Sequence, residues 1–298
     1  MTHRLLERPL YSNGFKLTVE TGWLEPSSLS EPVEQLRQKY RQHGYLWLKG
    51  LLEPERVLAF REYYFSAFKD TGLLRPGSAV VDGIYSGHIE DPVMAHRIAV
   101  EIVRSEVYNQ FCHSAPIVHF FENFLDGAVY LHRRKLIRYT LPGDPSCTGA
   151  HYDLTYLRGG TDRLCSMWIP VGDIPVEMGG LVYLEGSDAL GRGLEDMYRA
   201  DTANLPEEDR ISAYKYSLKN GWLGEDLNTL SQKYGARWLL ADYQAGDVVI
   251  HSPYMIHAST TNEDRQGRMR LSTDIRYQLA SDKIDTRWTQ DWSPDDKL

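Results

Sequence analysis

Short β-rich runs make up most of the second half of the chain, and few folds accommodate such a series. From about residue 127 onward, segments such as "LCSMWIPVGD", "GGLVYLEGSD" and "MRLSTDIRYQ" are separated by Gly, Pro and Asp. Runs of this length and spacing are typical of sandwiches and barrels. We therefore predict a mainly β fold whose sandwich spans residues 127–285.

The first part of the chain, residues 1–126, reads mainly as helix. "SEPVEQLRQKYRQHG" has a possible cap at Ser30 and ends at Gly44, and "PERVLAFREYYFSAFKDTG" repeats this pattern up to Gly72. Two more helices are predicted through "MAHRIAVEIVRSEVYNQFC" and "IVHFFENFL". We expect these flanking α-helices to pack outside the sandwich.

A polar, helix-prone segment at residues 190–235 interrupts the β-rich part. It is too long for a hairpin connection, so we predict an insert or a lid. We find no internal repeat and no low-complexity segment, and 298 residues can bury one large core. The sequence therefore predicts a single domain over residues 1–298.

Composition argues against several classes of protein. A formal net charge of −8 does not fit a nucleic-acid binder. The segment "MTHRLLERPLYSNG" lacks an apolar core, and no run approaches about 18 apolar residues, so we expect neither a signal peptide nor a membrane span. Three cysteines without C-x-x-C spacing argue against a disulfide framework or a thiolate zinc site and favour a reducing, cytoplasmic compartment. They are Cys112, Cys147 and Cys165.

The stretch "TGAHYDLTYLRGG" at residues 148–160 contains a possible pair of metal ligands. If it is a strand, His151 and Asp153 point to the same face. With a second histidine they would form the two-histidine, one-carboxylate triad of non-haem Fe(II) oxygenases. On its own the tripeptide is a weak signal, because a polar strand end gives the same pattern.

The segment "GDVVIHSPYMIHASTTN" offers two candidates for the second histidine. His251 ends an apolar run, where a structural role is the simpler interpretation, and His257 follows after a short bend. Downstream, "RMRLSTDIRYQ" contains Arg268 and Arg270, and Ser272 faces the same side as Arg270. A guanidinium can clamp the far carboxylate of a diacid that chelates a metal, although strand arginines more often form surface ion pairs.

Together, H-x-D, then G-D followed by H-x-S, then R-x-S resemble the motifs of the Fe(II)/2-oxoglutarate dioxygenases, and in particular the phytanoyl-CoA dioxygenase-like family. "MWIPVGDIPVEMGGLVYLEGSD" also resembles a stretch of that family, with Asp188 in place of its usual histidine. The resemblance covers roughly residues 35–285. It implies a catalytic domain with the double-stranded β-helix fold (a cupin-like jelly roll), with helices buttressing one sheet.

The resemblance also implies roles for individual residues. His151, Asp153 and His257 would bind Fe(II) and so form the catalytic centre, which favours His257 over His251. Arg270 would clamp 2-oxoglutarate, with Arg268 as the fallback. The other residues that the resemblance and the R-x-S pattern place around this cosubstrate are Ser259, Ser272, Trp168, Ile137 and Tyr139.

We therefore expect an oxygenase that uses Fe(II), 2-oxoglutarate and O₂ to hydroxylate a small organic molecule, a secondary metabolite or a lipid-like compound, with release of succinate and CO₂. Because related halogenases lack the carboxylate ligand, Asp153 favours hydroxylation over halogenation. Desaturation, epimerisation and cyclisation remain alternatives, as do a zinc or manganese enzyme and a non-catalytic metal- or ligand-binding jelly roll. Its expected partner is a small-molecule substrate, and the oligomeric state, monomer or homodimer, is open.

The substrate pocket is predicted to lie among the N-terminal helices, the segment after Asp153 and the insert at residues 190–235. The basic stretch at residues 132–135 could contact an anionic substrate, even a CoA ester, but solvated charge is the favoured interpretation, because alternation divides the stretch between two faces of a strand. Candidate lining residues are Tyr152, Tyr156, Arg158, Tyr183 and Trp222.

Overall fold

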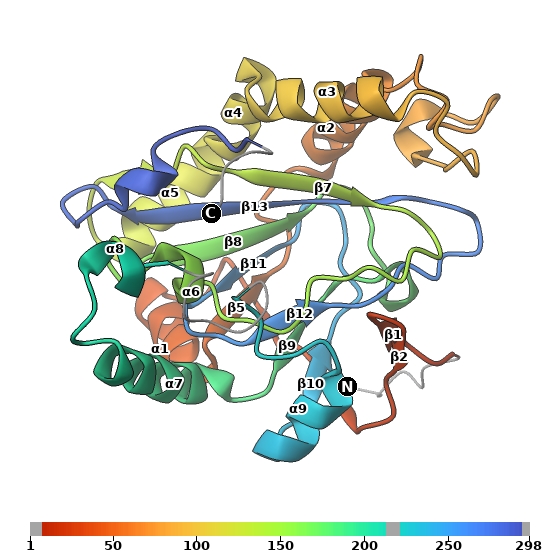
Figure 1. The fold of residues 1–298 in the computed structure, drawn as a ribbon. Helices are drawn as coiled ribbons and strands as arrows, with labels where there is room; N and C mark the ends of the chain where they lie inside the picture. Colours follow the sequence, from red (N-terminus) through yellow and green to blue (C-terminus); the bar gives the residue numbers. More distant parts are fainter. Residues whose placement is uncertain (1–7, 213–220, 294–298) are drawn as a thin grey trace.

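The computed structural model, which describes residues 8–212 and 221–293, contains two facing β-sheets with helices around them (Figure 1). The larger sheet has the order β4 (Pro26–Ser27), β5 (Tyr45–Leu48), β11 (Val248–His251), β8 (Cys165–Pro170), β13 (Arg270–Leu279), β6 (Val129–Leu131), and β7 (Leu136–Thr140) also pairs with β13. The smaller sheet has the order β12 (His257–Ser259), β9 (Leu181–Leu184), β10 (Trp238–Leu240), β3 (Thr21–Trp23). A separate hairpin joins β1 (Tyr11–Ser12) to β2 (Phe15–Lys16). The predicted mainly β jelly roll with flanking helices is confirmed.

Five helices from the first part of the chain pack against the larger sheet. They are α1 (Val33–His43), α2 (Pro54–Ser66), α3 (Pro92–Val103), α4 (Glu106–Cys112) and α5 (Ala115–Leu125). The first ends at Gly44 as predicted, because this residue adopts the left-handed conformation that closes a helix. Within the described residues, no helix is long and apolar enough to cross a membrane.

Three of the predicted helix boundaries were wrong. Ser30 does not cap the first helix, which begins at Val33 after Pro32 and has no side-chain cap. The helix expected to reach Gly72 ends at Ser66, where turns with shorter hydrogen-bond spacing take over. The single helix expected over residues 94–112 is divided into α3 and α4. The side chain of Ser105 accepts a hydrogen bond from the backbone N–H of Tyr108, which caps a new helix and separates the two.

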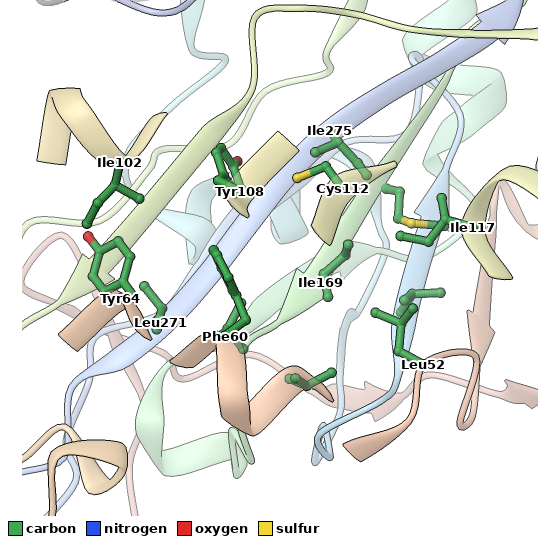
Figure 2. Packing of buried hydrophobic residues seen from close by; sticks show 14 of the residues in the cluster. Leu52, Phe60, Tyr64, Ile102, Tyr108, Cys112, Ile117, Ile169, Leu271 and Ile275 are labelled. Atoms are coloured by element: carbon green, nitrogen blue, oxygen red, sulfur yellow. The ribbon is translucent and has the colours of Figure 1, made fainter. Parts of the chain in front are cut away.

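Strand alternation sorts the side chains of the larger sheet into an apolar outer face and a more polar inner face. On β13, Leu271, Ile275 and Tyr277 point outward and are buried under the helices. Figure 2 shows this packing, with Phe60 of α2 and other helical side chains close to Leu271 and Ile275. The inner positions of the same strand carry Arg270, Ser272, Asp274, Arg276 and Gln278. A polar inner face predicts a binding site rather than a filled core.

Part of the space between the sheets is nevertheless filled by aromatic side chains. Trp168 of β8 packs against Tyr243, with ring centroids 4.7 Å apart, and Tyr183 of β9 belongs to the same buried cluster. The rest of the inner surface, on β7, β12 and β13, lines a cavity. The sandwich therefore has a packed region that supports an adjoining open site.

The predicted insert at residues 190–235 is mostly helical where it is described. It contains most of α7 (Ser187–Asp201), α8 (Glu207–Arg210) and α9 (Leu227–Tyr234), and residues 213–220 lie outside the described part. Leu227 of α9 accepts a hydrogen bond from the indole N–H of Trp238, which anchors the segment to the smaller sheet. The function of this segment as a lid stays a prediction, as do the proposed domain limits.

Glu195 of α7 holds a buried charge network that we expect to matter for stability. Its carboxylate is fully buried and accepts hydrogen bonds from Arg158, at 2.9 Å, and from the hydroxyl of Tyr152, at 3.0 Å. Glu195→Ala leaves the buried guanidinium unpaired and should lower the free energy of unfolding by about 3–5 kcal/mol. Urea denaturation measures this, with Glu34→Ala as the control, because its pair with Arg37 is exposed and worth at most about 1 kcal/mol. Equal losses in the two variants would contradict the prediction.

Candidate active site

The structure brings His151, Asp153 and His257 together in one buried cluster. One ligand atom of each lies within 4.8 Å of the others. Oδ1 of Asp153 is 3.6 Å from Nε2 of His151 and 3.8 Å from Nε2 of His257. The two imidazole rings have centroids 4.3 Å apart. Two nitrogens and one oxygen that converge on one point form the donor set of a two-histidine, one-carboxylate iron site.

The two histidines meet through backbone pairing, but the aspartate reaches them in a way that the sequence analysis did not predict. His151 and His257 form an antiparallel bridge, with N–H···O distances of 3.0 and 2.9 Å. The expectation that Asp153 continues a strand was wrong. Its backbone is helical and it precedes α6 (Leu154–Leu157). Asp153 therefore points toward the histidines because the chain turns from a strand into a helix.

Backbone carbonyl groups fix the orientation of both imidazole rings. Nδ1 of His151 is 2.8 Å from the carbonyl oxygen of Gly149, and Nδ1 of His257 is 3.0 Å from that of Met255. Because a carbonyl only accepts, each Nδ1 donates to it, and Nε2 is the ring nitrogen directed toward the cluster. This arrangement, in which the outer nitrogen is held by a hydrogen bond, is usual for histidines that bind metals.

The two carboxylate oxygens of Asp153 have different surroundings. Oδ2 accepts from Nη2 of Arg276 at 3.1 Å, from Nε2 of His251 at 3.4 Å, and from the hydroxyl of Ser166. Oδ1 is buried and has no hydrogen-bond partner among the described residues. A buried oxygen without a partner is costly, and a cation beside it would remove that cost. The residues present therefore fit a divalent metal ion bound through Oδ1.

The three donors to Asp153 come from one row across the larger sheet. Ser166 of β8 lies opposite His251 of β11 on one side and opposite Arg276 of β13 on the other. Side chains at such paired positions share a face, so all three point to the inside. Sequence reasoning missed Ser166 and Arg276. The sequence did contain one signal for Arg276, because a polar residue stands at every second position of β13.

Charge in this cluster favours the protonation states that a metal site needs. Burial would raise the pKa of Asp153, but the charge of Arg276 and the histidine contacts lower that pKa well below its usual range. Burial, reinforced by the neighbouring His151 and His251, lowers the pKa of His257 well below its usual range. At neutral pH the aspartate is therefore ionised and His257 is neutral.

His251, the competing histidine, lies beside the cluster in a supporting position. Its Nδ1 is 3.1 Å from the hydroxyl of Tyr183 and its Nε2 faces Oδ2 of Asp153. Both ring nitrogens are thus engaged by protein groups. The geometry supports the predicted choice of His257 as the ligand.

The two candidate arginines differ clearly in their surroundings. Arg270 lines the cavity, is 7% exposed, donates from Nη1 to the carbonyl of Gly179, and has no partner for its Nε among the described residues. Burial lowers its pKa to about 10, so the guanidinium is still charged at neutral pH. Arg268 instead donates from Nε and Nη2 to Asp264, at 3.1 and 2.7 Å. Arg270 is therefore the arginine available to a ligand.

The other residues predicted around the cosubstrate divide into two groups. The described lining of the cavity includes Ser259 and Tyr139 but not Trp168, Ile137 or Ser272. Ser259 accepts a hydrogen bond from the backbone N–H of Thr148, and Ile137 packs outward against the helix-covered core. A role for Trp168, Ile137 and Ser272 in binding 2-oxoglutarate stays a prediction.

The predicted substrate-lining residues also divide. Tyr156 and Trp222 line the cavity, whereas Tyr152 and Arg158 belong to the Glu195 network. Tyr183 packs behind the cluster, with its ring centroid 5.8 Å from that of His257.

The expectation of solvated charge at residues 132–135 was wrong for three of its four residues. His132, Arg134 and Lys135 are buried, and only Arg133 is exposed. The segment is covered by the C-terminal 3-10 turn Thr286–Trp288, whose Trp288 carbonyl accepts from the backbone N–H of Arg134. Strand alternation could not reveal this cover.

The contact of Ser166 with Asp153 leads to a prediction about metal affinity. Ser166→Ala removes one donor from Oδ2 and so loosens the carboxylate, which should weaken metal binding about 10- to 100-fold. Isothermal titration with Co(II), without 2-oxoglutarate, measures the change. Ser272→Ala is the matched control, since this serine is equally buried on the neighbouring strand. An unaltered affinity in Ser166→Ala would rule out the supporting role.

Comparisons with known proteins identify the family of this chain. Residues 40–270 match the phytanoyl-CoA dioxygenase (PhyH) family. The chain is 24% identical to 1-deoxypentalenic acid 11-beta-hydroxylase from Streptomyces exfoliatus, over 87% of this chain and 86% of that protein. Its fold is similar to that of the epimerase SnoN from nogalamycin biosynthesis. The SnoN structure with Fe³⁺, alpha ketoglutarate and nogalamycin RO gives a TM-score of 0.55 and 16% identity over 85% of each chain.

The fold is also similar to that of a second protein from nogalamycin biosynthesis, the non-heme alpha ketoglutarate dependent carbocyclase SnoK. The match covers 87% of this chain and 89% of the SnoK chain, with a TM-score of 0.51 and 18% identity. The family match spans well over half of the sequence and contains the H-x-D pair, the second histidine and Arg270. The chain belongs to the phytanoyl-CoA dioxygenase family of Fe(II)- and 2-oxoglutarate-dependent oxygenases.

Proposed function

We propose that this oxygenase binds Fe(II) through His151, Asp153 and His257 and hydroxylates a small organic molecule, a secondary metabolite or a lipid-like compound. The observation that carries the proposal is the buried Oδ1 of Asp153, which has no described partner and faces both free Nε2 atoms. When bound, Fe(II) would supply the redox chemistry by which O₂, the oxidant, oxidises 2-oxoglutarate to succinate and CO₂ and hydroxylates a substrate C–H bond.

The residues of the chain contribute orientation and electrostatics to this chemistry. Ser166, His251 and Arg276 hold Oδ2 of Asp153, so that Oδ1 stays directed at the metal position. Arg270 offers a charged, buried guanidinium for the distal carboxylate of 2-oxoglutarate. The site also contains the carboxylate ligand that related halogenases lack, which supports hydroxylation rather than halogenation.

The cavity supports a small-molecule substrate. Its volume is about 730 Å³, which falls within the usual range of ligand pockets and must also accommodate the cosubstrate. Aromatic side chains, including Tyr156, Trp222 and Trp288, form part of its wall. The hydroxylase relative from Streptomyces exfoliatus supports hydroxylation as the outcome. Epimerisation, cyclisation and desaturation stay alternatives that the site residues do not separate.

The test of this function is spectroscopic and needs no substrate. Anaerobic addition of Fe(II) and 2-oxoglutarate should produce the weak visible charge-transfer band of the chelate, and a screen of candidate substrates should then identify compounds that stimulate succinate release. A protein that binds neither iron nor 2-oxoglutarate would refute the proposal. We also propose a cytoplasmic location, which the three free, buried cysteines support.

A further inference from the structure

One cavity arginine has no role in the site described so far. Arg138 lies on β7 directly opposite Ser272 of β13, so it shares the inner face with Arg270. Its side chain is exposed and lines the cavity. Among the described residues, no hydrogen bond or ion pair engages its guanidinium. A charged group held in a cavity without a partner is available to a ligand.

Each of the other three cavity arginines has either a partner in the protein or a proposed role at the cosubstrate. Arg276 pairs with Asp153 at 3.1 Å, and Arg270 donates to the carbonyl of Gly179 and is reserved for the cosubstrate. Arg134 lies over the ring of Trp288, with its guanidinium carbon 5.3 Å from the ring centroid. These contacts distinguish Arg138 from the arginines that build the site.

The charges around the cavity point to an anionic ligand. Its described lining contains four arginines and three aspartates, an excess of one positive charge, whereas the whole chain carries −8. Fe(II) and 2-oxoglutarate carry equal and opposite charges, so their binding leaves this excess unchanged. Asp153 is matched by Arg276, and Asp144 accepts the backbone N–H of Ser146. A substrate with one negative charge would neutralise the one excess positive charge of the cavity.

Asp274 is the acidic group that could compete for Arg138. It occupies the next inner position of β13 and lies opposite Leu136, which places it diagonally from Arg138. No ion pair joins the two side chains in the described structure. Asp274 lies between Arg270 and Arg276 on its own strand, and its negative charge acts to raise the pKa of both arginines. Arg138 therefore keeps its charge available to the cavity.

We propose that Arg138 binds the carboxylate of the substrate, and that the substrate is a monocarboxylic acid with an apolar body. The guanidinium fork suits a carboxylate, and Leu136, Leu141 and Trp222 offer apolar surface in the same cavity. This assignment rests on the proposed function, because Arg270 and the metal position must first be taken by 2-oxoglutarate and Fe(II). Arg138 is then the residue that selects acids over neutral compounds.

The experiment uses adamantane-1-carboxylate as the probe, with adamantane-1-carboxamide and 1-aminoadamantane as its neutral and cationic counterparts. The full-length protein is first loaded with Co(II) and N-oxalylglycine, which occupy the metal and cosubstrate positions without turnover. Isothermal titration then measures the binding of each probe to the wild type, to Arg138→Gln and to the control Arg268→Gln. Arg268 is a suitable control because its guanidinium is paired with Asp264.

We expect the carboxylate to bind at least about 10-fold more tightly than the amide or the amine, and Arg138→Gln to remove that preference. Arg268→Gln should bind like the wild type. Three outcomes would overturn the assignment. They are equal binding of the acid and the amide, no binding of the acid, and a preference for the acid that is unchanged in Arg138→Gln. Loss of N-oxalylglycine binding in Arg138→Gln would also overturn it, by placing Arg138 at the cosubstrate. Failure of the wild type to bind Co(II) and N-oxalylglycine would instead overturn the proposed function.

Discussion

Replacing His151 or Asp153 with alanine should reduce 2-oxoglutarate-dependent succinate formation to the background level. Each substitution removes one of three converging donors and leaves too few protein ligands to hold Fe(II) at the geometry of the site. Succinate formed per enzyme, measured with and without added iron, gives the result. Circular dichroism before the assay shows whether each variant is folded. This check matters most for Asp153→Ala, because it leaves the charge of Arg276 buried without its partner.

His251→Ala is the matched control for this experiment. His251 lies as close to the cluster as the proposed ligands, with its ring centroid 4.5 Å from that of His257, but it contacts Oδ2 of Asp153 and not the Oδ1 atom that faces the two ligand histidines. Removing a group that orients a ligand typically costs about 10- to 100-fold. We therefore expect His251→Ala to keep measurable activity. Wild-type turnover in His151→Ala and Asp153→Ala would remove both residues from the metal site.

Much of the fold could be predicted from the sequence because its signals are local. The β-rich runs after residue 127 become the strands of the sandwich, and the amphipathic segments before it become helices that cover one sheet. The division between α3 and α4 was missed, since a serine inside an amphipathic segment reads equally well as helix interior or as a cap. The burial of Arg134 and Lys135 was missed for another reason. It depends on the distant segment that ends in Trp288, which the sequence does not place.

For the site, sequence could identify the residues that bear the chemistry better than those that support them. His151, Asp153, His257 and Arg270 belong to short motifs with a recognisable order. The groups around Asp153 come instead from the alignment of three strands, which places Ser166 beside both His251 and Arg276. A shift of one residue in either pairing would turn these side chains to the other face. Register between distant strands is set by the packing of the whole sandwich, so it cannot be read from one segment.

Arg270→Ala should raise the concentration of 2-oxoglutarate needed for half-maximal turnover by about 30-fold or more. Removing one partner of a buried, hydrogen-bonded charge pair costs about 2–5 kcal/mol, and every 1.4 kcal/mol is a factor of about ten in affinity. Arg270 meets these conditions, because it is nearly buried, charged at neutral pH, and has an Nε without a partner in the described structure. Initial rates over a range of 2-oxoglutarate concentrations separate this effect from a change in maximal rate.

The choice between the two arginines of this strand follows from what each already contacts. Arg268→Ala should leave the 2-oxoglutarate requirement nearly unchanged, since the guanidinium of Arg268 is held by Asp264 and its side chain is 30% exposed. Arg270→Lys should recover part of the affinity, because it restores the charge but not the planar fork that binds both carboxylate oxygens. A requirement that rises in Arg268→Ala and stays constant in Arg270→Ala would exchange their roles. Arg270 would then be a buried cation whose contact with Gly179 only joins the two sheets.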